Sequence, residues 1–456
     1  MSRLLLLILF CWSVSSYVSA MPVSEPRFAV CVVKAQGLLL QVQDRLSGRY
    51  ALPGGYVESG EAGAEAARRE LYEETGLQAR TLQRLPVASR NGDFYACQLL
   101  NPMQWSANSG DINILSAPHL GREIIRARLL TPQNIAATAP QRFADQWSLI
   151  EPYWQQIPES PVSIQADFRT QANLLQQHEL LGLQYWQHWG RQWPLWWLTN
   201  LPGTLAFWLC CLPFWRWRLG DQAVHQSLTG TLLVLSLVEL MKVWLAWPRP
   251  FHFMPELAWQ TAAGYGMPSG HTALALFFTL LLGWQAGWGK TVAWCSAAAI
   301  TVGVALTRTV WGVHFFSDTV VGAVIGLFAF GLIRHHWRPR QLTLFSTGAA
   351  GILLFATWHY QSQPLLQLLG AWFGGLLARW RYPVDSQPSR CAQSKPRLIK
   401  EWGWIGITLL LQALLPYGTL GSLSLLSLQT LLWCALSYYL IAPPRNRLRQ
   451  YTTGST

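Results

Sequence analysis

The second half of the chain places cations, histidines and one carboxylate at the ends of apolar segments. In chain order they are Lys242, Arg249, Ser269, Gly270, His271, Arg308, His314 and Asp318. Ionisable groups at membrane depth mark functional sites by default. Arginine presents a planar fork of donors that matches phosphate oxygens, and the N–H groups that begin a helix bind anions. These residue types predict a phosphate site.

The histidines and the carboxylate indicate which reaction this site supports. Asp318 follows His314 by four residues, so the two side chains share a helical face if the helix has begun. A carboxylate bonded to one ring nitrogen fixes the tautomer and makes the other nitrogen more nucleophilic. His271 can protonate a leaving oxygen. We therefore expect phosphoryl transfer through a phosphohistidine, with no metal, because the three cations supply the electrostatic stabilisation.

A second group of carboxylates lies near the N-terminus, within Gly54 to Leu77. Glu70, Glu73 and Glu74 have i, i+3 and i+4 spacing, which places them on one helical face. Three carboxylates repel one another unless a cation joins them, and hard oxygen ligands suit Mg²⁺ or Mn²⁺. Arg69 can pair with one carboxylate and hold it in place. This group predicts a divalent-metal site.

The elements that position the carboxylates belong to a soluble α/β domain at residues 21–160. Short β-rich runs cover Phe28–Val33, Gly37–Gln43 and Phe94–Leu100, and Ala62–Thr75 reads as a helix that Gly76 ends. The segment 158–163 has the composition of a linker. Residues 161–192 are expected to hold this linker and a helix along the membrane surface. Cys31 and Cys97 are either a disulfide or two unpaired strand residues.

The eight residues of the predicted phosphate site, called the phosphate-type residues below, belong to a membrane domain. Only 12% of residues are charged, about half the level of soluble proteins, and the 26 Trp suit interfacial belts. The net charge of +12 does not indicate nucleic acid, because the basic residues after position 210 cluster between apolar segments. Nine spans are expected near 195–215, 226–247, 271–288, 291–308, 316–334, 341–359, 364–379, 403–419 and 424–442.

Two independent features predict the orientation. Residues 1–20 have the pattern of a secretory signal peptide, with an uncleaved anchor as the alternative; either one exports the following domain. When the loops between the expected spans are numbered from the first span, Arg and Lys gather in the odd-numbered loops and in the C-terminal tail. The positive-inside rule predicts that these parts are cytoplasmic. The phosphate-type residues then share the outer face with the exported domain.

The spacing of the membrane residues resembles a known family. "KVWLAWPRP", "PSGH" and "TRTVWGVHFFSD" match the three-part motif of the type 2 phosphatidic acid phosphatases, over about residues 180–335. The resemblance implies His314 as nucleophile, Asp318 as its orienting partner and His271 as general acid. It also implies a set of phosphate ligands: Lys242, Arg249, Ser269, Gly270 and Arg308. Undecaprenyl diphosphate, phosphatidylglycerophosphate and phosphatidate are substrates in this family, and an outward-facing site favours the first.

The carboxylate segment resembles the Nudix box, G-x5-E-x7-R-E-L-x-E-E-x-G-L, starting at Gly55. The resemblance covers about residues 26–150 and implies Mg²⁺- or Mn²⁺-assisted water attack on a diphosphate joined to another group. Glu73 and Glu74 would hold the metal with a carbonyl of the Gly55 region, and Glu70 would be a ligand or the base. Weaker assignments are a supporting role for Glu61 and a further ligand or base at Glu123. A nucleoside diphosphate compound is one candidate substrate; a regulatory or binding module that does not cleave is the alternative.

The sequence therefore predicts a multidomain protein, an α/β Nudix fold with a mixed sheet sandwiched by helices, followed by an all-α membrane bundle. The expected parts are 1–20 (signal), 21–160 (Nudix), 161–192 (linker and interfacial helix), 193–340 (phosphatase core) and 341–456 (additional helices and tail). The expected location is a bacterial inner membrane, with both sites periplasmic and the C-terminus cytoplasmic. Membrane lipid phosphates are the expected partners, and the oligomeric state stays open. A transporter or a haloperoxidase would share some of these features.

Overall fold

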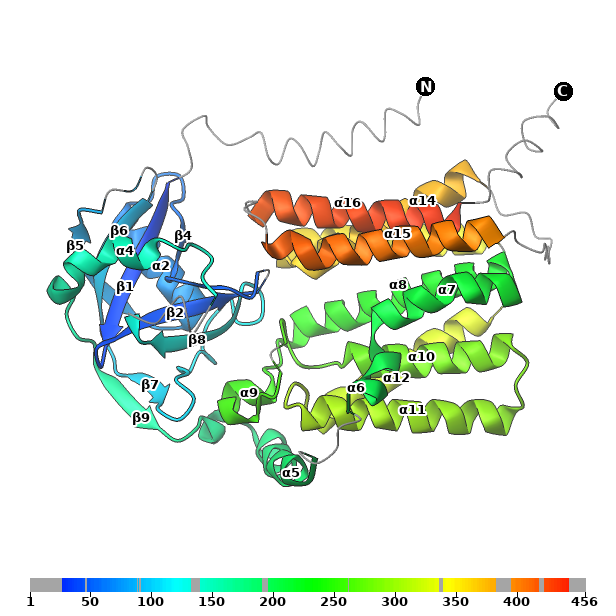
Figure 1. The fold of residues 1–456 in the computed structure, drawn as a ribbon, viewed down its shortest axis with the longest axis horizontal. Coiled ribbons are helices and arrows are strands. Elements are labelled where there is room, and N and C mark those ends of the chain that lie inside the picture. Colours follow the sequence, from blue (N-terminus) through cyan, green and yellow to red (C-terminus); the bar gives the residue numbers. More distant parts are fainter. Residues whose placement is uncertain are drawn as a thin grey trace.

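The computed structural model describes residues 27–45, 47–87, 89, 92–132, 140–190, 196–260, 262–335, 339–382, 395–417 and 422–442. The expected signal peptide, residues 1–20, and the charged C-terminal tail lie outside these ranges. An α/β half and a helical half stand side by side in Figure 1, with the helices of the second half running roughly parallel to one another.

The α/β half is built on a seven-stranded sheet. Its strands are β1 (Phe28–Ala35), β2 (Leu38–Asp44), β3 (Tyr50–Ala51), β4 (Gly54–Tyr56), β5 (Ala79–Leu85), β6 (Gly92–Leu99) and β8 (Ile124–Leu130). The order is β3-β2-β1-β6-β5, with β4 on β1 and β8 on β2. The β1–β6 pair is parallel and the others are antiparallel, so the sheet is mixed as predicted.

Helices cover both faces of this sheet because β1 alternates its side chains between two cores. Cys31 and Val33 face α2 (Gly63–Thr75), and Val30 and Val32 face α4 (Gln146–Ile150) and the 3-10 helix η2 (Glu151–Gln156). Gly76 ends α2 in the left-handed conformation (φ 74°), the expected stop. Cys31 and Cys97 are joined by a disulfide between β1 and β6, so the first of the two alternatives is observed.

The segment read as a linker continues the α/β half. It leads into β9 (Val162–Gln165), which pairs in parallel with β7 (Met103–Ser106) in a second, two-stranded sheet. Composition missed this strand because its stabilising partner lies about sixty residues away in sequence. The 3-10 helix η3 (Arg169–Gln171) and the helix α5 (Leu174–Gly190) follow and lead to the helical half.

The helical half contains eleven α-helices and three short 3-10 helices among the described residues: α6 (Trp196–Asn200), η4 (Leu201–Gly203), α7 (Leu205–Leu219), α8 (Asp221–Leu245), α9 (Pro250–Phe253), η5 (Pro255–Leu257), α10 (Gly270–Gln285), α11 (Lys290–Val310), α12 (Phe316–Arg334), α13 (Pro339–Tyr360), α14 (Gln363–Arg381), α15 (Lys395–Leu414), η6 (Leu415–Tyr417) and α16 (Ser422–Ile441). The expected span 195–215 is not one helix, because Pro202 and Gly203 interrupt it.

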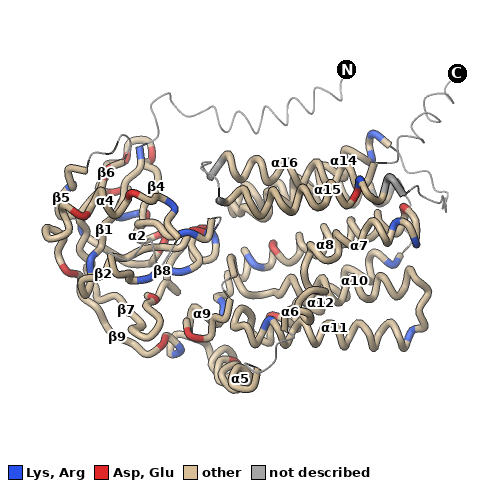
Figure 2. The backbone as a smooth tube through the Cα atoms, in the orientation of Figure 1, with Lys and Arg blue, Asp and Glu red and all other residues tan. Residues whose placement is uncertain are grey.

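Four stretches of these helices are long and apolar enough to cross a membrane: Asp221–Phe253, Lys290–Val310, Phe316–Arg334 and Ser424–Ile441. An all-helical membrane half is therefore supported, and the count of nine spans stays a prediction. In Figure 2, charged residues are sparse along the length of the bundle and more frequent near the ends of its helices.

Close helix contacts bring the ends of α10 and α12 together. A Cβ on Gly322 would lie 2.3 Å from the Ser269 carbonyl oxygen, and a Cβ on Gly326 would lie 2.4 Å from that of Ala273. Only glycine permits this approach of α12 to the start of α10, where two of the predicted phosphate ligands lie.

Arg216 and Arg379, two of the basic residues that the positive-inside rule assigned to odd-numbered loops, are instead buried inside the bundle. Arg216 Nε lies 3.1 Å from Glu401 Oε1, which links α7 to α15. Arg379 Nη2 donates to Thr229 Oγ1 at 2.6 Å, which links α14 to α8. A buried cation requires a partner, and these partners lie far away in the sequence. The C-terminal helices are thus bonded to the helices that precede them.

Candidate active sites

The predicted phosphate-type residues all lie at helix ends directed toward the α/β half (Figures 1 and 2). Lys242 is in the last turn of α8, and Arg249 is the residue before α9. Ser269 caps α10, whose first residues are Gly270 and His271. The remaining residues are Arg308 near the end of α11, His314 in the following turn and Asp318 in the first turn of α12. The structure brings this end of five helices together.

His314 and Asp318 form the buried pair that the spacing predicts. His314 Nδ1 lies 3.1 Å from Asp318 Oδ2, and the side chains are 3% and 0% exposed. The same carboxylate oxygen accepts the Phe315 N–H at 2.9 Å, which fixes its position. Because Nδ1 donates to the carboxylate, a neutral ring keeps its lone pair on Nε2. That nitrogen lies 3.4 Å from Arg249 Nη1.

Arg249 is held rigidly by backbone carbonyls. Its Nε donates to Gly264 O at 2.7 Å, Nη1 to Val313 O at 2.7 Å and Nη2 to Ala263 O at 2.8 Å. Arg249 as a whole is 3% exposed. These carbonyls orient the cation without neutralising it, so its charge stays available beside His314 Nε2.

Arg308 and the start of α10 provide further donors for an anion. The Arg308 side chain is buried, and its Nε has no hydrogen-bond partner among the described residues. An unpartnered buried donor is costly, and a bound phosphate oxygen would satisfy it. Ser269 is fully buried and its N–H donates to Asp318 O at 2.9 Å. The helix α10 therefore begins directly against the His314–Asp318 pair, with its positive end at the site.

Lys242 has a partner that sequence reasoning missed. Its Nζ donates to Glu239 Oε1 at 2.8 Å, one turn earlier on α8, with both side chains largely buried. The sequence did offer a signal for this pair, because Glu239 stands three residues before a lysine at membrane depth. Glu239 was overlooked because it lies outside the three-part phosphatase motif. Glu239 holds the ammonium in place until a phosphate competes for it.

His271 lies within electrostatic range of Lys242, Arg249 and Arg308, and also of His314. It is the second residue of α10, half-buried, and its backbone packs against Gly203. The surrounding cations disfavour a protonated ring, and a bound anionic phosphate would offset them and favour the protonated ring that a general acid needs.

The α/β half packs directly on these residues. His252 accepts the Arg249 N–H on Nδ1 at 3.0 Å and donates from Nε2 to Ile125 O in β8 at 3.0 Å. The Ile125 side chain packs with Phe251, Trp311 and Val313 around the Arg249 and His314 turns. This histidine connects the two halves, and no pattern in the sequence indicated it.

The carboxylates of α2 converge around Arg69. Its Nη1 contacts Glu70 Oε1 at 2.8 Å and Glu73 Oε2 at 3.0 Å, and its Nε contacts Glu61 Oε1 at 2.9 Å. The Arg69 hydrogen bond holds the pKa of Glu61 below its usual range. The predicted pairing of Arg69 with carboxylates is observed, and it extends to three of them.

Glu74 and Gly55 complete this group. Glu74 Oε2 accepts the Gly54 N–H at 3.0 Å, and a Cβ on Gly55 would lie 2.4 Å from the Glu70 carboxyl carbon. Burial raises the pKa of Glu70, and burial with the nearby Glu70 carboxylate raises that of Glu74 well above its usual range. Crowded carboxylates that resist ionisation are relieved by a divalent cation.

Within the described residues, no group of three His, Cys, Asp or Glu side chains is arranged to hold a metal ion. Arg69 supplies the positive charge among the carboxylates as they lie here. Glu123 approaches from the loop before β8, where its carboxylate lies 3.3 Å from His119 Nδ1. The donor types fit Mg²⁺ or Mn²⁺, and ion binding requires that Arg69 release Glu70 and Glu73.

Comparison with known protein families agrees with both groups of residues. The model of the NUDIX domain matches residues 23–146, and the model of the PAP2 superfamily matches residues 223–342. This chain joins a NUDIX domain to a PAP2 superfamily domain. The named relatives of both regions are phosphatases.

Curated relatives match one half each. Sphingosine-1-phosphate phosphatase 2 of Mus musculus is 29% identical over 140 residues, which are 30% of this chain and 40% of the relative. Phosphatase NudJ of Escherichia coli K12 is 44% identical over 52 residues, which are 11% of this chain and 34% of the relative. The chain thus spans well under two thirds of the length of each.

Similar solved structures include NUDIX hydrolases. An ADP-ribose pyrophosphatase from Streptococcus suis aligns over 31% of this chain and all of its own, at 16% identity and a TM-score of 0.23. A NUDIX hydrolase from Nitrosomonas europaea aligns over 31% of this chain and 79% of its own, at 16% identity and the same TM-score.

Proposed function

We propose that the PAP2 domain releases phosphate from a membrane lipid phosphate or diphosphate through a phosphohistidine at His314. The observation that carries this proposal is the buried His314–Asp318 pair, whose free ring nitrogen lies beside the carbonyl-anchored Arg249. Arg308, whose Nε has no hydrogen-bond partner among the described residues, and the start of α10 offer the remaining donors.

In the first step, the His314 Nε2 lone pair attacks phosphorus and the bond from phosphorus to the leaving oxygen breaks. Asp318 stabilises the positive charge that develops on the ring. His271 gives its proton to the leaving oxygen, and the cations hold the equatorial phosphate oxygens. In the second step, water loses a proton to His271 and attacks phosphorus, which breaks the P–N bond and frees phosphate.

A lipid substrate follows from the position of the site and from its relatives. The residues lie at the end of apolar helices, where a headgroup can reach them while its chains stay in the membrane. The name of the sphingosine-1-phosphate phosphatase relative specifies a lipid phosphate. We favour undecaprenyl diphosphate or phosphatidylglycerophosphate in a bacterial inner membrane. Contact of the NUDIX domain with the site end supports a common periplasmic side, opposite a cytoplasmic C-terminus.

For the NUDIX domain we propose Mg²⁺- or Mn²⁺-dependent hydrolysis of a diphosphate compound. Glu70, Glu73 and Glu74 would hold the ion with a Gly55 carbonyl, and the ion would polarise the diphosphate and activate water. A regulatory role is the second candidate. It is favoured by the loop of His119 and Glu123, which lies just before the Ile125 contact with the phosphatase half.

The test is phosphate release by the full-length protein in detergent from a panel of lipid phosphates and nucleoside diphosphate compounds. We expect His314→Ala to abolish release from lipid phosphates, and Glu73→Gln to abolish only the metal-dependent hydrolysis of soluble diphosphates. Acid-labile phosphate should appear on the wild-type protein after rapid quenching and be absent from His314→Ala. Lipid phosphatase activity that survives in His314→Ala would refute the role of this histidine.

A further inference from the structure

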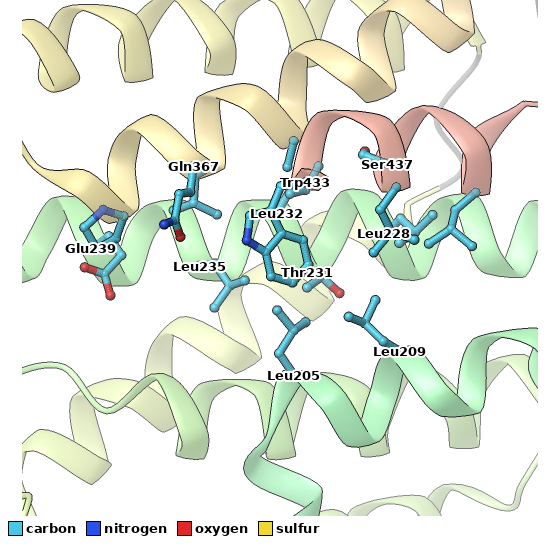
Figure 3. Close-up of a pocket in the computed structure, with 15 residues that line it drawn as sticks. Leu205, Leu209, Leu228, Thr231, Leu232, Leu235, Glu239, Gln367, Trp433 and Ser437 are labelled. Atoms are coloured by element: carbon cyan, nitrogen blue, oxygen red, sulfur yellow. The ribbon is translucent and has the colours of Figure 1, made fainter. Parts of the chain in front are cut away.

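A small apolar cavity lies inside the helical half (Figure 3). Its volume is about 190 Å³, enough for a thin stretch of hydrocarbon and too little for a large headgroup. Its walls come from α7, α8, α14 and α16. The residues that line it are Leu205, Leu209, Leu228, Thr231, Leu232, Leu235, Glu239, Pro364, Gln367, Leu368, Ala371, Trp433, Leu436, Ser437 and Leu440.

One end of the cavity joins the candidate phosphatase site. Glu239 lines the cavity, and the same carboxylate accepts a hydrogen bond from Lys242 Nζ at 2.8 Å. Figure 3 places Glu239 at one end of the labelled residues and Leu228 toward the other. A chain that enters beside Lys242 would therefore run away from the phosphate and along α8.

The length of the cavity fits one leaflet. Glu239 and Leu228 are separated by roughly 16 Å along α8, at the α-helical rise of about 1.5 Å per residue. The hydrocarbon core of a bilayer is about 30 Å thick. A chain held between these two residues would thus extend from the headgroup level to about the middle of the membrane.

The polar side chains in the wall are largely satisfied elsewhere. Thr231 Oγ1 donates to Ser227 O at 2.7 Å, and Gln367 Nε2 donates to Gln429 Oε1 at 2.9 Å. The Ser437 hydroxyl has no partner among the described residues. Leucine side chains make up most of the remaining surface, so the wall suits hydrocarbon and offers a polar ligand few partners.

We propose that this cavity binds one hydrocarbon chain of the lipid whose phosphate reacts at His314. The inference rests on the proposed lipid phosphatase function and adds a role for the C-terminal helices. Two of the four walls, α14 and α16, lie beyond residues 223–342 that match the PAP2 family. These helices would select lipids by chain length and shape, whereas the family core acts on the phosphate.

The expected size of the chain-length preference follows from the surroundings that the lipid chain leaves when it enters the cavity. A lipid chain moves from an apolar bilayer into an apolar cavity, so close packing, and not the hydrophobic effect, favours binding. We therefore expect a moderate preference, about three- to tenfold in kcat/KM, when the chain fills the cavity.

The first experiment fills the cavity with Ala371→Phe and uses Ala298→Phe as the matched control. Ala371 lines the cavity on α14, and Ala298 is exposed on the outer face of α11. Phosphate release is measured in detergent from two lipid phosphates with the same headgroup, one with a long chain and one with a chain too short to reach Leu228. We expect Ala371→Phe to lose the long-chain preference and to keep wild-type release from the short lipid, and Ala298→Phe to keep both.

Equal chain preference in wild type and Ala371→Phe would overturn the inference while leaving the lipid phosphatase function intact. Absence of release from both lipids by the wild type would overturn the function and the inference with it. If Ala371→Phe does not fold, the wild-type protein is photolabelled instead. The probe is a long-chain lipid phosphate that carries a photoreactive diazirine near its chain end. Labelling should concentrate on Gln363–Arg381 and Ser422–Ile441; labelling spread over the outer faces of α11 and α12 would refute the proposal.

Discussion

Replacement of Asp318 by Asn tests the assignment of the nucleophile most directly. The carboxylate accepts from His314 Nδ1 at 3.1 Å and from the Phe315 N–H at 2.9 Å. Asp318→Asn keeps the size of the side chain and removes its charge. The new amide can donate to Nδ1, which would move the ring proton to Nε2 and occupy the attacking lone pair.

The magnitude follows from the same distance. Two unit charges 3.1 Å apart attract each other by about 5 kcal/mol at an effective dielectric constant of about 20. The ring becomes positive only as it attacks phosphorus, so this attraction is available in the transition state and not before. Since about 1.4 kcal/mol corresponds to a factor of ten in rate, the expected loss in kcat is about 10³- to 10⁴-fold.

The assay is phosphate release from a lipid monophosphate by full-length protein in detergent. Glu256→Gln is the control, because Glu256 is an exposed carboxylate in η5 whose Oε1 accepts a hydrogen bond from Asn108 Nδ2 at 3.0 Å. It should retain wild-type activity. An Asp318→Asn protein that unfolds at the wild-type temperature and keeps more than about a tenth of the wild-type kcat would refute the orientation mechanism.

Other predictions test the remaining parts. EDTA should abolish NUDIX hydrolysis of soluble diphosphates and leave lipid phosphate release unchanged, as measured by free phosphate in parallel assays. Arg308→Ala should reduce kcat/KM for lipid phosphate by about 10²-fold, because it removes a cation whose Nε has no hydrogen-bond partner among the described residues; a loss below about threefold would exclude Arg308 as a ligand. Cys31→Ala should destabilise the NUDIX domain by up to about 4 kcal/mol, the entropy of closing a loop between residues 66 apart, measured by denaturant unfolding. His252→Phe should lower lipid phosphate release about tenfold, because it leaves the Arg249 N–H and the Ile125 carbonyl unpaired; unchanged release would show that this bridge does not support the site.

Local spacing predicted most of what is local in the structure. Two pairs have i, i+4 spacing, which places both side chains on one face of a helix: His314 with Asp318, and Arg69 with Glu73. The strands around Cys31 and the stop at Gly76 follow from alternation and from glycine chemistry. Residues close in sequence and regular in period could therefore be placed without coordinates.

Long-range partners could not be predicted. The carbonyls that anchor Arg249 belong to Ala263, Gly264 and Val313, and backbone carbonyls carry no sequence signal. Arg379 resembled a loop cation because its partner on α8 is 150 residues away. The break before α7, in contrast, was readable from Pro202 and Gly203, but the apolar run around them outweighed that signal.

One short stretch of the NUDIX domain, residues 119–125, contributes to both candidate sites. It carries the His119–Glu123 pair at the carboxylates, and its Ile125 carbonyl accepts from His252 at the phosphatase site. Arg45 binds the same stretch through Gly121 O at 2.5 Å and packs against Gly264, the anchor of Arg249. A substitution within residues 119–125 can therefore alter either activity. The loss of one activity after such a substitution would not show which domain catalyses that reaction. Glu73 and His314 lie outside it, and for that reason their separate replacement can assign each reaction to one domain.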